Sequence, residues 1–290
     1  MQEIKKIEIE DKEYPKVLKK IEDPPKVLYF RGNFDITKKP CFAIVGTRRC
    51  SSYGKQVALE IAGDLATAGL VIVSGMAQGI DTFSHKGCLE RRGKTIAVLG
   101  TGLDEKSIYP QTNLELARKI IETGGVLISE YPTGFHGSKI TFPQRNRIIA
   151  GLSLGTLIIE AKKRSGALIT AHWARKQEKT VFAVPGPVHS LNSWGPNYLI
   201  KKGAKLVTSV NDILEELNLS PNSEISKRQI KGETIEENVI LEALKEENMC
   251  IDKIIEKTNL APATVASTLT VLEIKNKVRN LGGNIYAIMR

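Results

Sequence analysis

The sequence predicts a doubly wound, mostly parallel α/β sheet followed by a small winged-helix domain. Two patterns in the 290 residues lead to this fold class. Between residues 41 and 217, short β-branched apolar runs alternate with amphipathic stretches of helical length, which is typical of βαβ units in a sheet covered on both faces. After residue 233, three helical patterns precede one hairpin pattern, which is the element order of a winged helix. The chain is 41% hydrophobic and 26% charged, as globular proteins are.

The elements of the sheet domain follow from these runs in order. The predicted strands are 41–45, 70–74, 95–99, 126–129, 156–159, 180–184 and 204–207. The predicted helices are 53–68, 79–92, 113–123, 145–152, 166–177 and 211–217. Residues 1–40 carry Tyr14-Pro15, Asp23-Pro24-Pro25 and an extended run at 27–31. This segment is too short for a core of its own, so we expect a lead-in that packs on the sheet domain.

The C-terminal part is predicted from its composition and periodicity. Residues 218–233 are rich in Ser, Asn, Lys and Glu and indicate a linker. In the winged-helix domain, 234–290, apolar residues recur at helical spacing over 235–245, 251–258 and 262–275. Residues 278–289 indicate a hairpin that turns at Gly282-Gly283-Asn284.

Several classes of protein are excluded by the sequence. The longest apolar runs fall far short of the ~18 residues that span a bilayer, and the N-terminal residues alternate in charge, so we expect a cytoplasmic protein without membrane contact. The four cysteines form neither a CxxC pair nor a Cys/His cluster, which argues against structural zinc and disulfides. No motif calls for a metal or a cofactor: the GxGxxG fingerprint, the Walker A spacing, HExxH and GxSxG are all absent.

The net charge of +10 is concentrated in one stretch of the chain. Residues 139–205 hold twelve basic and two acidic residues, whereas residues 234–290 hold seven basic and eight acidic ones. A basic patch of this kind attracts a polyanion through counterion release. Charge alone does not separate such a patch from a solvated basic face.

Three predicted strands end in glycine, giving Gly46-Thr47-Arg48-Arg49, then Gly75-Met76-Ala77-Gln78-Gly79, and Gly100-Thr101-Gly102. The carboxyl ends of parallel strands meet at one edge, where glycine lets the backbone approach a ligand and helix amides face an anion. Arg48 and Ser51 in the first loop favour a phosphate pocket. The alternative is that these glycines only form tight turns.

A second group of basic residues lies around the predicted helix at 145–152. Pro143 precedes that helix, so Arg145, Asn146 and Arg147 are expected in its first turn, where cations oppose the helix dipole. This local cost indicates an anionic ligand. The following loop, Lys162-Lys163-Arg164-Ser165-Gly166, lies at the same sheet edge. Phe142 is either a stacking face for a base or a core residue. Glu160 is expected to orient Arg164 or Asn146, with a general acid/base role as the alternative.

The chain resembles the DNA-processing protein A family of bacteria, also called DprA or Smf. The resemblance begins in the lead-in, residues 14–33. It continues through AIVGTR (43–48), SGMAQGID (74–81), PQRNRIIAGLS (143–153), SGALITA (165–171), AVPG (183–186) and SWGPNYLI (193–200). Six motifs in the family's order make the resemblance highly specific.

The resemblance implies an extended Rossmann-like domain that binds single-stranded DNA, forms a homodimer and loads the RecA recombinase during natural transformation or recombination. It implies a non-enzymatic protein that protects incoming single-stranded DNA. The expected nucleic-acid-binding residues are Arg48, Ser51, Lys139, Arg145, Asn146, Arg147, Lys162, Lys163, Arg164, Ser165 and Gly166.

Two alternatives remain at this point. In the first, the protein is a nucleotide or phosphoribosyl hydrolase of a related Rossmann-like class in which Glu160 is catalytic. In the second, it is a transcription factor that reads DNA through the winged helix. The near-neutral charge of residues 234–290 weakens the second and favours a protein-contact or regulatory role for that domain.

Overall fold

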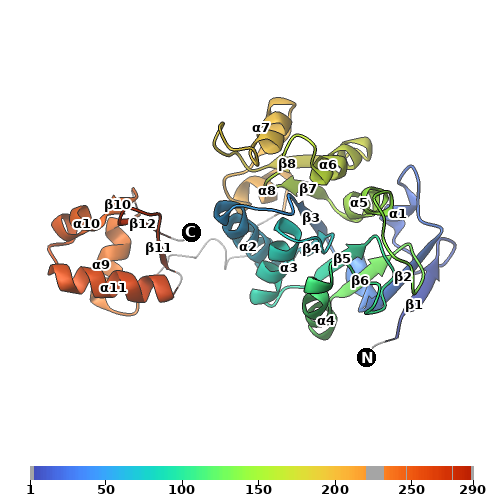
Figure 1. Cartoon of the computed structure of the whole chain (residues 1–290), viewed down its shortest axis with the longest axis horizontal. Coiled ribbons are helices and arrows are strands. Elements are labelled where there is room, and N and C mark those ends of the chain that lie inside the picture. The colour runs from blue at the N-terminus through green and yellow to red at the C-terminus, as the bar shows by residue number, and fades with distance from the viewer. Residues whose placement is uncertain (1–2, 220–231, 246, 276, 289–290) are drawn as a thin grey trace. The chain divides into compact units, whose positions relative to one another are not determined.

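The computed structural model describes residues 3–219, 232–245, 247–275 and 277–288. The chain divides into two compact units, residues 1–226 and residues 227–290 (Figure 1). The predicted fold class is confirmed: a mostly parallel α/β sheet forms the first unit and a winged helix the second. Most of the predicted linker, residues 220–231 of 218–233, lies outside the described residues.

The first unit is built on a nine-stranded sheet in the order β1-β2-β6-β5-β4-β3-β7-β8-β9. Its seven parallel strands each lie within one residue of the predicted ends. They are β3 (Cys41–Val45), β4 (Val71–Ser74), β5 (Thr95–Leu99), β6 (Val126–Ser129), β7 (Gly155–Ile158), β8 (Thr180–Ala183) and β9 (Lys205–Leu206). Most of them are buried on both faces, which explains why they are continuous apolar runs without alternation.

The lead-in contributes two strands to the same sheet. β1 (Lys5–Glu8) pairs antiparallel with β2 (Val27–Gly32), and β2 pairs antiparallel with β6. Between them lies the short α1 (Lys16–Lys19), and η1 (Phe34–Lys38) follows β2. The buried hydroxyl of Tyr14 donates to the carbonyl of Pro25 at 2.7 Å. The sequence analysis predicted the extended run that becomes β2, but it did not predict β1. Three of the four residues of β1 are charged, so this strand lacks an apolar pattern.

Helices cover both faces of the sheet (Figure 1). One face is covered by α2 (Ser52–Thr67), α3 (Ile80–Glu90), α4 (Leu114–Glu122) and α8 (Val210–Glu216), with η2 (Gln111–Asn113) before α4. The other is covered by α1, α5 (Thr141–Leu152), α6 (Gly166–Lys176) and α7 (Trp194–Lys201). β3 and β7 are neighbours, but the helices that follow them, α2 and α6, lie on opposite faces. A crevice opens where strand order reverses in this way.

Two helices differ from the sequence-based expectation. α7 was not predicted, because Gly195 and Pro196 in its first turn look like loop residues, although proline is compatible with a first turn. α5 begins at Thr141, four residues before the expected start. The hydroxyl of Ser138 accepts hydrogen bonds from the amides of Ile140 and Thr141 and thereby fixes this earlier start. Arg145 and Arg147 therefore lie beyond the first turn, and the predicted conflict with the helix dipole was wrong.

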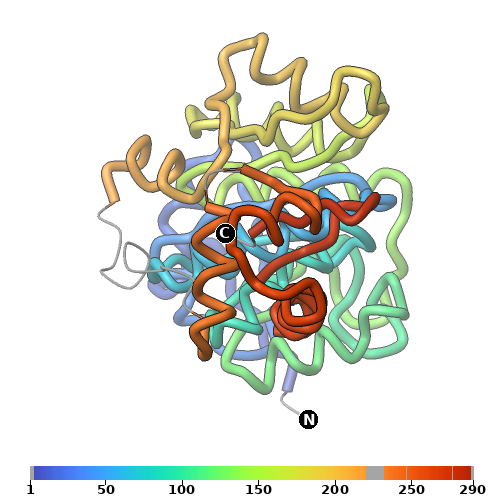
Figure 2. The backbone as a smooth tube through the Cα atoms, turned by 90° about the vertical axis from the view of Figure 1, so that its left-hand side faces the viewer, coloured from blue at the N-terminus to red at the C-terminus, as the bar shows by residue number. Residues whose placement is uncertain are grey.

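The second unit has the element order of a winged helix. Its elements are α9 (Ile235–Ala243), β10 (Met249–Cys250), α10 (Ile251–Thr258), α11 (Pro262–Ile274), β11 (Val278–Asn280) and β12 (Ile285–Ile288), traced in orange and red in Figure 2. The strands form a sheet in the order β10-β12-β11. Gly282, Gly283 and Asn284 all have positive φ, as the predicted hairpin turn requires. Met289, at the end of the predicted hairpin, lies outside the described residues.

Candidate functional site

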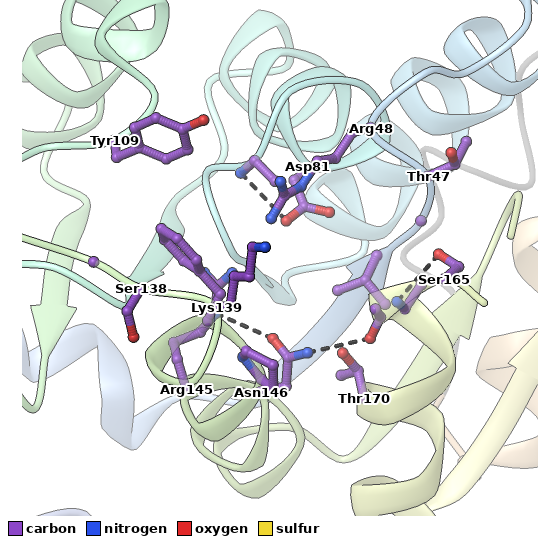
Figure 3. A pocket seen from close by; sticks show the side chains of 18 of the residues that line it. Thr47, Arg48, Asp81, Tyr109, Ser138, Lys139, Arg145, Asn146, Ser165 and Thr170 are labelled. Carbon is purple, nitrogen blue, oxygen red and sulfur yellow. Dashed lines mark hydrogen bonds between the residues drawn. The ribbon is translucent and has the colours of Figure 1, made fainter.

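A cleft of about 940 Å³ opens at the carboxyl edge of the sheet in the first unit. Loops that follow β3, β4, β5, β6 and β7 all line it, so the crevice predicted from strand order is the site of a cavity. Figure 3 shows the side chains around this cleft. The predicted residues that line it are Arg48, Lys139, Arg145, Asn146, Lys162, Arg164, Ser165 and Gly166.

The loop after β3 carries Arg48, which is exposed at the rim of the cleft. This loop is held against the start of α3, where the amide of Ile80 donates to the carbonyl of Thr47 at 3.2 Å. Gly79 makes the approach close: its φ is 77°, and a Cβ there would lie 2.3 Å from the Thr47 oxygen. Only glycine fits this position without displacing the Arg48 loop.

Glu160 fastens the same loop from the other side. Its carboxylate accepts hydrogen bonds from the amide of Ser51 at 2.9 Å, from the Ser51 hydroxyl, and from the side-chain amide of Asn192 at 3.2 Å. The expectation that Glu160 orients Arg164 or Asn146 was wrong. Ser51 does not line the cleft. Its hydroxyl donates a hydrogen bond to Glu160 and accepts one from the amide of Gly54 at the start of α2. Glu160 is buried, and it does not line the cleft either.

Arg145 forms the floor of the cleft. It is buried and donates from Nη1 to the carbonyls of Gly75 and Val98, which ties α5 to the ends of β4 and β5. Its Nε donates to Oδ1 of Asn146 at 3.1 Å, and Asn146 donates to the carbonyl of Gly166 at 3.2 Å (Figure 3). These hydrogen bonds therefore connect Arg145, at the floor of the cleft, to the basic loop of residues 162–166.

Asp81 is the acidic residue whose charge acts on this buried cation. Its carboxylate accepts from the amide of Gly75 at 3.1 Å. Burial raises the pKa of Asp81, and the charge of Arg145 opposes that rise. Burial lowers the pKa of Arg145 to about 10, so its guanidinium is still protonated at neutral pH. Arg145 thus keeps its own positive charge at the floor of the cleft, where it attracts an anion.

Arg147 and Lys163 are not brought to the cleft. The guanidinium of Arg147 is buried and pairs with the carboxylate of Glu130 through two bonds of 2.7 and 2.9 Å. It also lies 3.1 Å from a carboxylate oxygen of Asp23 in the lead-in. The sequence analysis placed Arg147 in the ligand group because it was expected in the first turn of the helix together with Arg145 and Asn146. Its structural partners, 17 and 124 residues away, were not visible from that local pattern.

The cleft contains residues that the sequence analysis missed. Arg49, Lys106 and His136 line it, and so does Tyr109. Tyr109 and Phe142 lie with their ring centroids 5.5 Å apart, and the Arg48 guanidinium lies 5.7 Å from the Phe142 centroid. Lys106 and Tyr109 follow the third glycine-ended strand, so Gly100-Thr101-Gly102 was the available signal. The loop is long, and which of its side chains turn inward depends on its tertiary path.

The cleft is strongly cationic. Seven lysine and arginine side chains line it, against Asp81 as the only acidic residue among its described lining residues. Arginine and lysine in such a concentration bind phosphate groups through charge-assisted hydrogen bonds. In the part of the chain that the structure describes, no group of three or more His, Cys, Asp or Glu residues could hold a metal ion.

Comparison with known proteins assigns the chain to a family. The sequence profile of DNA recombination-mediator protein A matches residues 5–218, nearly the whole first unit. The chain belongs to this family. The profile of the DprA winged helix domain matches residues 225–284. The resemblance found in the sequence motifs is thereby confirmed.

Relatives in this DprA family share much of the chain. DNA processing protein DprA of Bacillus subtilis is 44% identical over 74% of this chain and 72% of its own length. Protein Smf of Escherichia coli is 44% identical over 70% of this chain and 54% of its own length. Both matches exceed 200 residues.

Solved structures of the family show the same fold. DprA of Streptococcus pneumoniae has a TM-score of 0.69 at 44% identity, covering 74% of this chain and 75% of that one. DNA processing protein A of Helicobacter pylori has a TM-score of 0.66 at 33% identity, covering 75% of this chain and 98% of that one. The latter structure was described for its single-stranded DNA binding mode. Among the described residues of this chain, no helix is long and apolar enough to cross a membrane.

Proposed function

We propose that this DprA family member binds single-stranded DNA in the cationic cleft of its first unit. The observation that carries the proposal is the concentration of seven basic side chains, one of them the buried Arg145, around a cavity of about 940 Å³. The single-stranded DNA binding described for the Helicobacter pylori relative supports it.

The lining of the cleft favours a single strand over a duplex. Tyr109 and Phe142 offer aromatic rings beside the phosphate-binding side chains, and every base has a face that can stack on such a ring. A duplex keeps its bases paired and stacked on each other, so it cannot use these rings. Binding of this kind is steeply salt-dependent and nearly independent of base sequence.

The family resemblance supports a wider proposal. The protein protects incoming single-stranded DNA and helps to load the RecA recombinase in natural transformation or recombination. It acts as a homodimer in the cytoplasm, and it is not an enzyme. The last point is supported by Glu160, because its carboxylate is engaged by Ser51 and Asn192 and does not line the cleft. A nucleotide hydrolase would need that carboxylate free beside its substrate.

The test is binding of a fluorescent single-stranded oligonucleotide across a salt series, with a duplex of the same sequence as competitor. The double substitution Arg48→Ala/Lys139→Ala removes two cations that line the cleft. We expect it to weaken binding of every sequence about 10- to 100-fold and to lower the slope of log K against log salt by about 2.

The matched control is Lys12→Ala/Lys26→Ala, which removes the same charge from exposed positions outside the cleft. It should bind nearly as the unchanged protein does. Equal affinities for the two double variants, or a preference for the duplex, would refute the proposed function.

A further inference from the structure

A cluster of two lysines and one phenylalanine lies on the surface of α2 and α3, outside the cleft. The ammonium group of Lys55 in α2 lies 5.1 Å from the centre of the Phe83 ring in α3, and that of Lys86 lies 5.7 Å from the same point. Both lysines are exposed, and Phe83 is half-buried. Because the face of an aromatic ring attracts cations, Phe83 holds both ammonium groups in place.

The two ammonium groups carry charges that nothing nearby neutralises. They share one ring, so they lie no farther apart than the sum of their distances from its centre. Within the residues that the structure describes, neither lysine forms an ion pair with a carboxylate within 4 Å. Two like charges held close together repel each other, and an anion placed between them removes that repulsion. The Lys55–Phe83–Lys86 cluster therefore favours an anionic ligand.

The packing of α2 on α3 determines where the cluster lies. The two helices lie side by side (Figure 1). They approach closely at Gly87, where a Cβ would lie 2.2 Å from the carbonyl oxygen of Leu59. Lys55 and Phe83 each lie one turn earlier in their own helix, so the two helices run in the same direction and begin near each other.

Both helices begin at the cleft. Arg49, which stands just before α2, lines the cleft, and so does Asp81 in the first turn of α3. Lys55 and Phe83 therefore lie about one helical turn beyond residues that line the cleft. A strand that leaves the cleft past Arg49 meets this cluster next.

We propose that Lys55 and Lys86, positioned by Phe83, bind phosphates of single-stranded DNA that leaves the cleft past Arg49. This inference rests on the proposed function and adds the direction in which the strand continues. The cluster binds the sugar–phosphate backbone and not the bases, because the two ammonium groups already lie over the ring. The contact is therefore independent of base sequence.

The test compares binding of oligo-dT of about 4 and about 12 nucleotides by the full chain. The cleft holds the shorter oligonucleotide, and only the longer one reaches the cluster. We expect Lys55→Gln/Lys86→Gln to weaken binding of the longer oligonucleotide about three- to tenfold and to lower its slope of log K against log salt by about 1.4. Binding of the shorter one should be unchanged. The matched control is Lys12→Gln/Lys26→Gln, which removes the same charge from exposed positions in the lead-in.

A single substitution tests the positioning role of the ring. Phe83→Leu keeps an apolar side chain and both lysines but removes the ring that holds them. We expect it to weaken binding of the longer oligonucleotide about two- to threefold and to leave the shorter one unchanged. Equal affinities of Phe83→Leu and the unchanged protein for the longer oligonucleotide would refute this role.

Neutral phosphate analogues test whether the lysines act on the backbone. In a 12-nucleotide oligo-dT, methylphosphonates replace all phosphates outside a central block of about four, which removes the charge beyond the cleft and keeps every base. The unchanged protein and Lys55→Gln/Lys86→Gln should bind this analogue equally. A loss of affinity in the variant for the analogue would show that the cluster contacts bases instead.

Lysine footprinting observes the contact in the unchanged protein. Reductive methylation followed by mass spectrometry measures how exposed each lysine is. We expect the longer oligonucleotide to protect Lys55 and Lys86, and the shorter one to leave both reactive. Lys12 and Lys26 should react equally in all samples.

The outcomes separate the two proposals. If the unchanged protein binds neither oligonucleotide, the proposed function fails, and the contact at α2 and α3 fails with it. If it binds both, but Lys55→Gln/Lys86→Gln loses no more affinity for the longer one than the control does, the contact is wrong and the proposed function stands. An equal loss for both lengths, or unprotected Lys55 and Lys86 in the longer complex, also overturns the contact alone.

Discussion

At the residue scale, Arg145 and Arg147 belong to the same helix, α5, but have different roles. Arg145 keeps its charge at the floor of the cleft, where the carbonyls of Gly75 and Val98 hold it. Arg147 instead joins α5 to Glu130, just after β6, and to the lead-in. The Asp23 side chain is 75% exposed and contributes little, so the pair with Glu130 dominates.

We predict that Arg147→Ala destabilises the first unit by about 3 kcal/mol, because it leaves Glu130 partly buried without its partner. DNA affinity per folded molecule should be unchanged, since Arg147 does not line the cleft. Urea unfolding followed by tryptophan fluorescence measures the first effect, and the oligonucleotide titration measures the second. A variant of normal stability and weakened binding would place Arg147 in the DNA site after all.

At the element scale, the turn between β4 and α3 positions the Arg48 loop. We predict that Gly79→Ala weakens single-stranded DNA binding about tenfold, because its Cβ would push against the Thr47 carbonyl and displace Arg48. It should also cost about 1–3 kcal/mol of stability through backbone strain.

Gly69→Ala is the matched control for this change. Gly69 also has a positive φ, 92°, but nothing lies within 4 Å of its Cβ position. Its substitution should cost stability and leave DNA affinity intact. Equal binding by the two variants would show that Gly79 does not position the Arg48 loop.

The winged helix has an internal charge pair with a pH-dependent consequence. Lys275 at the end of α11 donates to the buried carboxylate of Glu237 in α9 at 2.6 Å, and this bond lowers the pKa of Glu237 below its ordinary value of 4.5. A carboxyl whose pKa is lower in the folded state stabilises that state above the unfolded pKa. This contribution is lost as the pH falls from about 4.5 through the folded pKa.

We therefore predict that the winged helix, which has its own core, loses thermal stability between pH 5 and 3 more steeply in the unchanged sequence than with Glu237→Gln. Circular dichroism melting of a fragment of residues 227–290 measures this. An equal loss of melting temperature with falling pH in the two fragments would show that Glu237 does not stabilise the winged helix through a lowered pKa. Lys275 and Lys277, the lysines at the end of the third helix, both form ion pairs with Glu233 and Glu237, which leaves fewer cations there to bind phosphate.

At the scale of the whole molecule, the two units differ in charge and therefore in expected role. The cationic cleft belongs entirely to the first unit, whereas the C-terminal residues 234–290 are close to neutral. We predict that a protein of residues 1–219 retains the single-stranded DNA affinity and salt slope of the full chain within about threefold. Fluorescence anisotropy across the same salt series compares the two. Binding that is lost with the winged helix would transfer the DNA contact to the second unit.

The fold was predictable because its signals are local. Each parallel strand is a short apolar run, and each glycine that follows β3, β4 or β5 stands next to that run. The parallel strands and the edge that carries the cleft therefore follow from the sequence alone. The same holds for the hairpin turn at Gly282-Gly283-Asn284. The family motifs also lie in continuous segments.

The partners of individual side chains were decided only by tertiary structure. Glu160 meets Ser51 across 109 residues, and Arg145 meets Gly75 across 70, so neither contact leaves a trace in local spacing. The inward turn of Lys106 and Tyr109 and the contact of Lys55 with Phe83 depend equally on the path of the chain through space. Hydrophobic periodicity determines which face of an element is buried, but it does not determine which distant groups meet at that face.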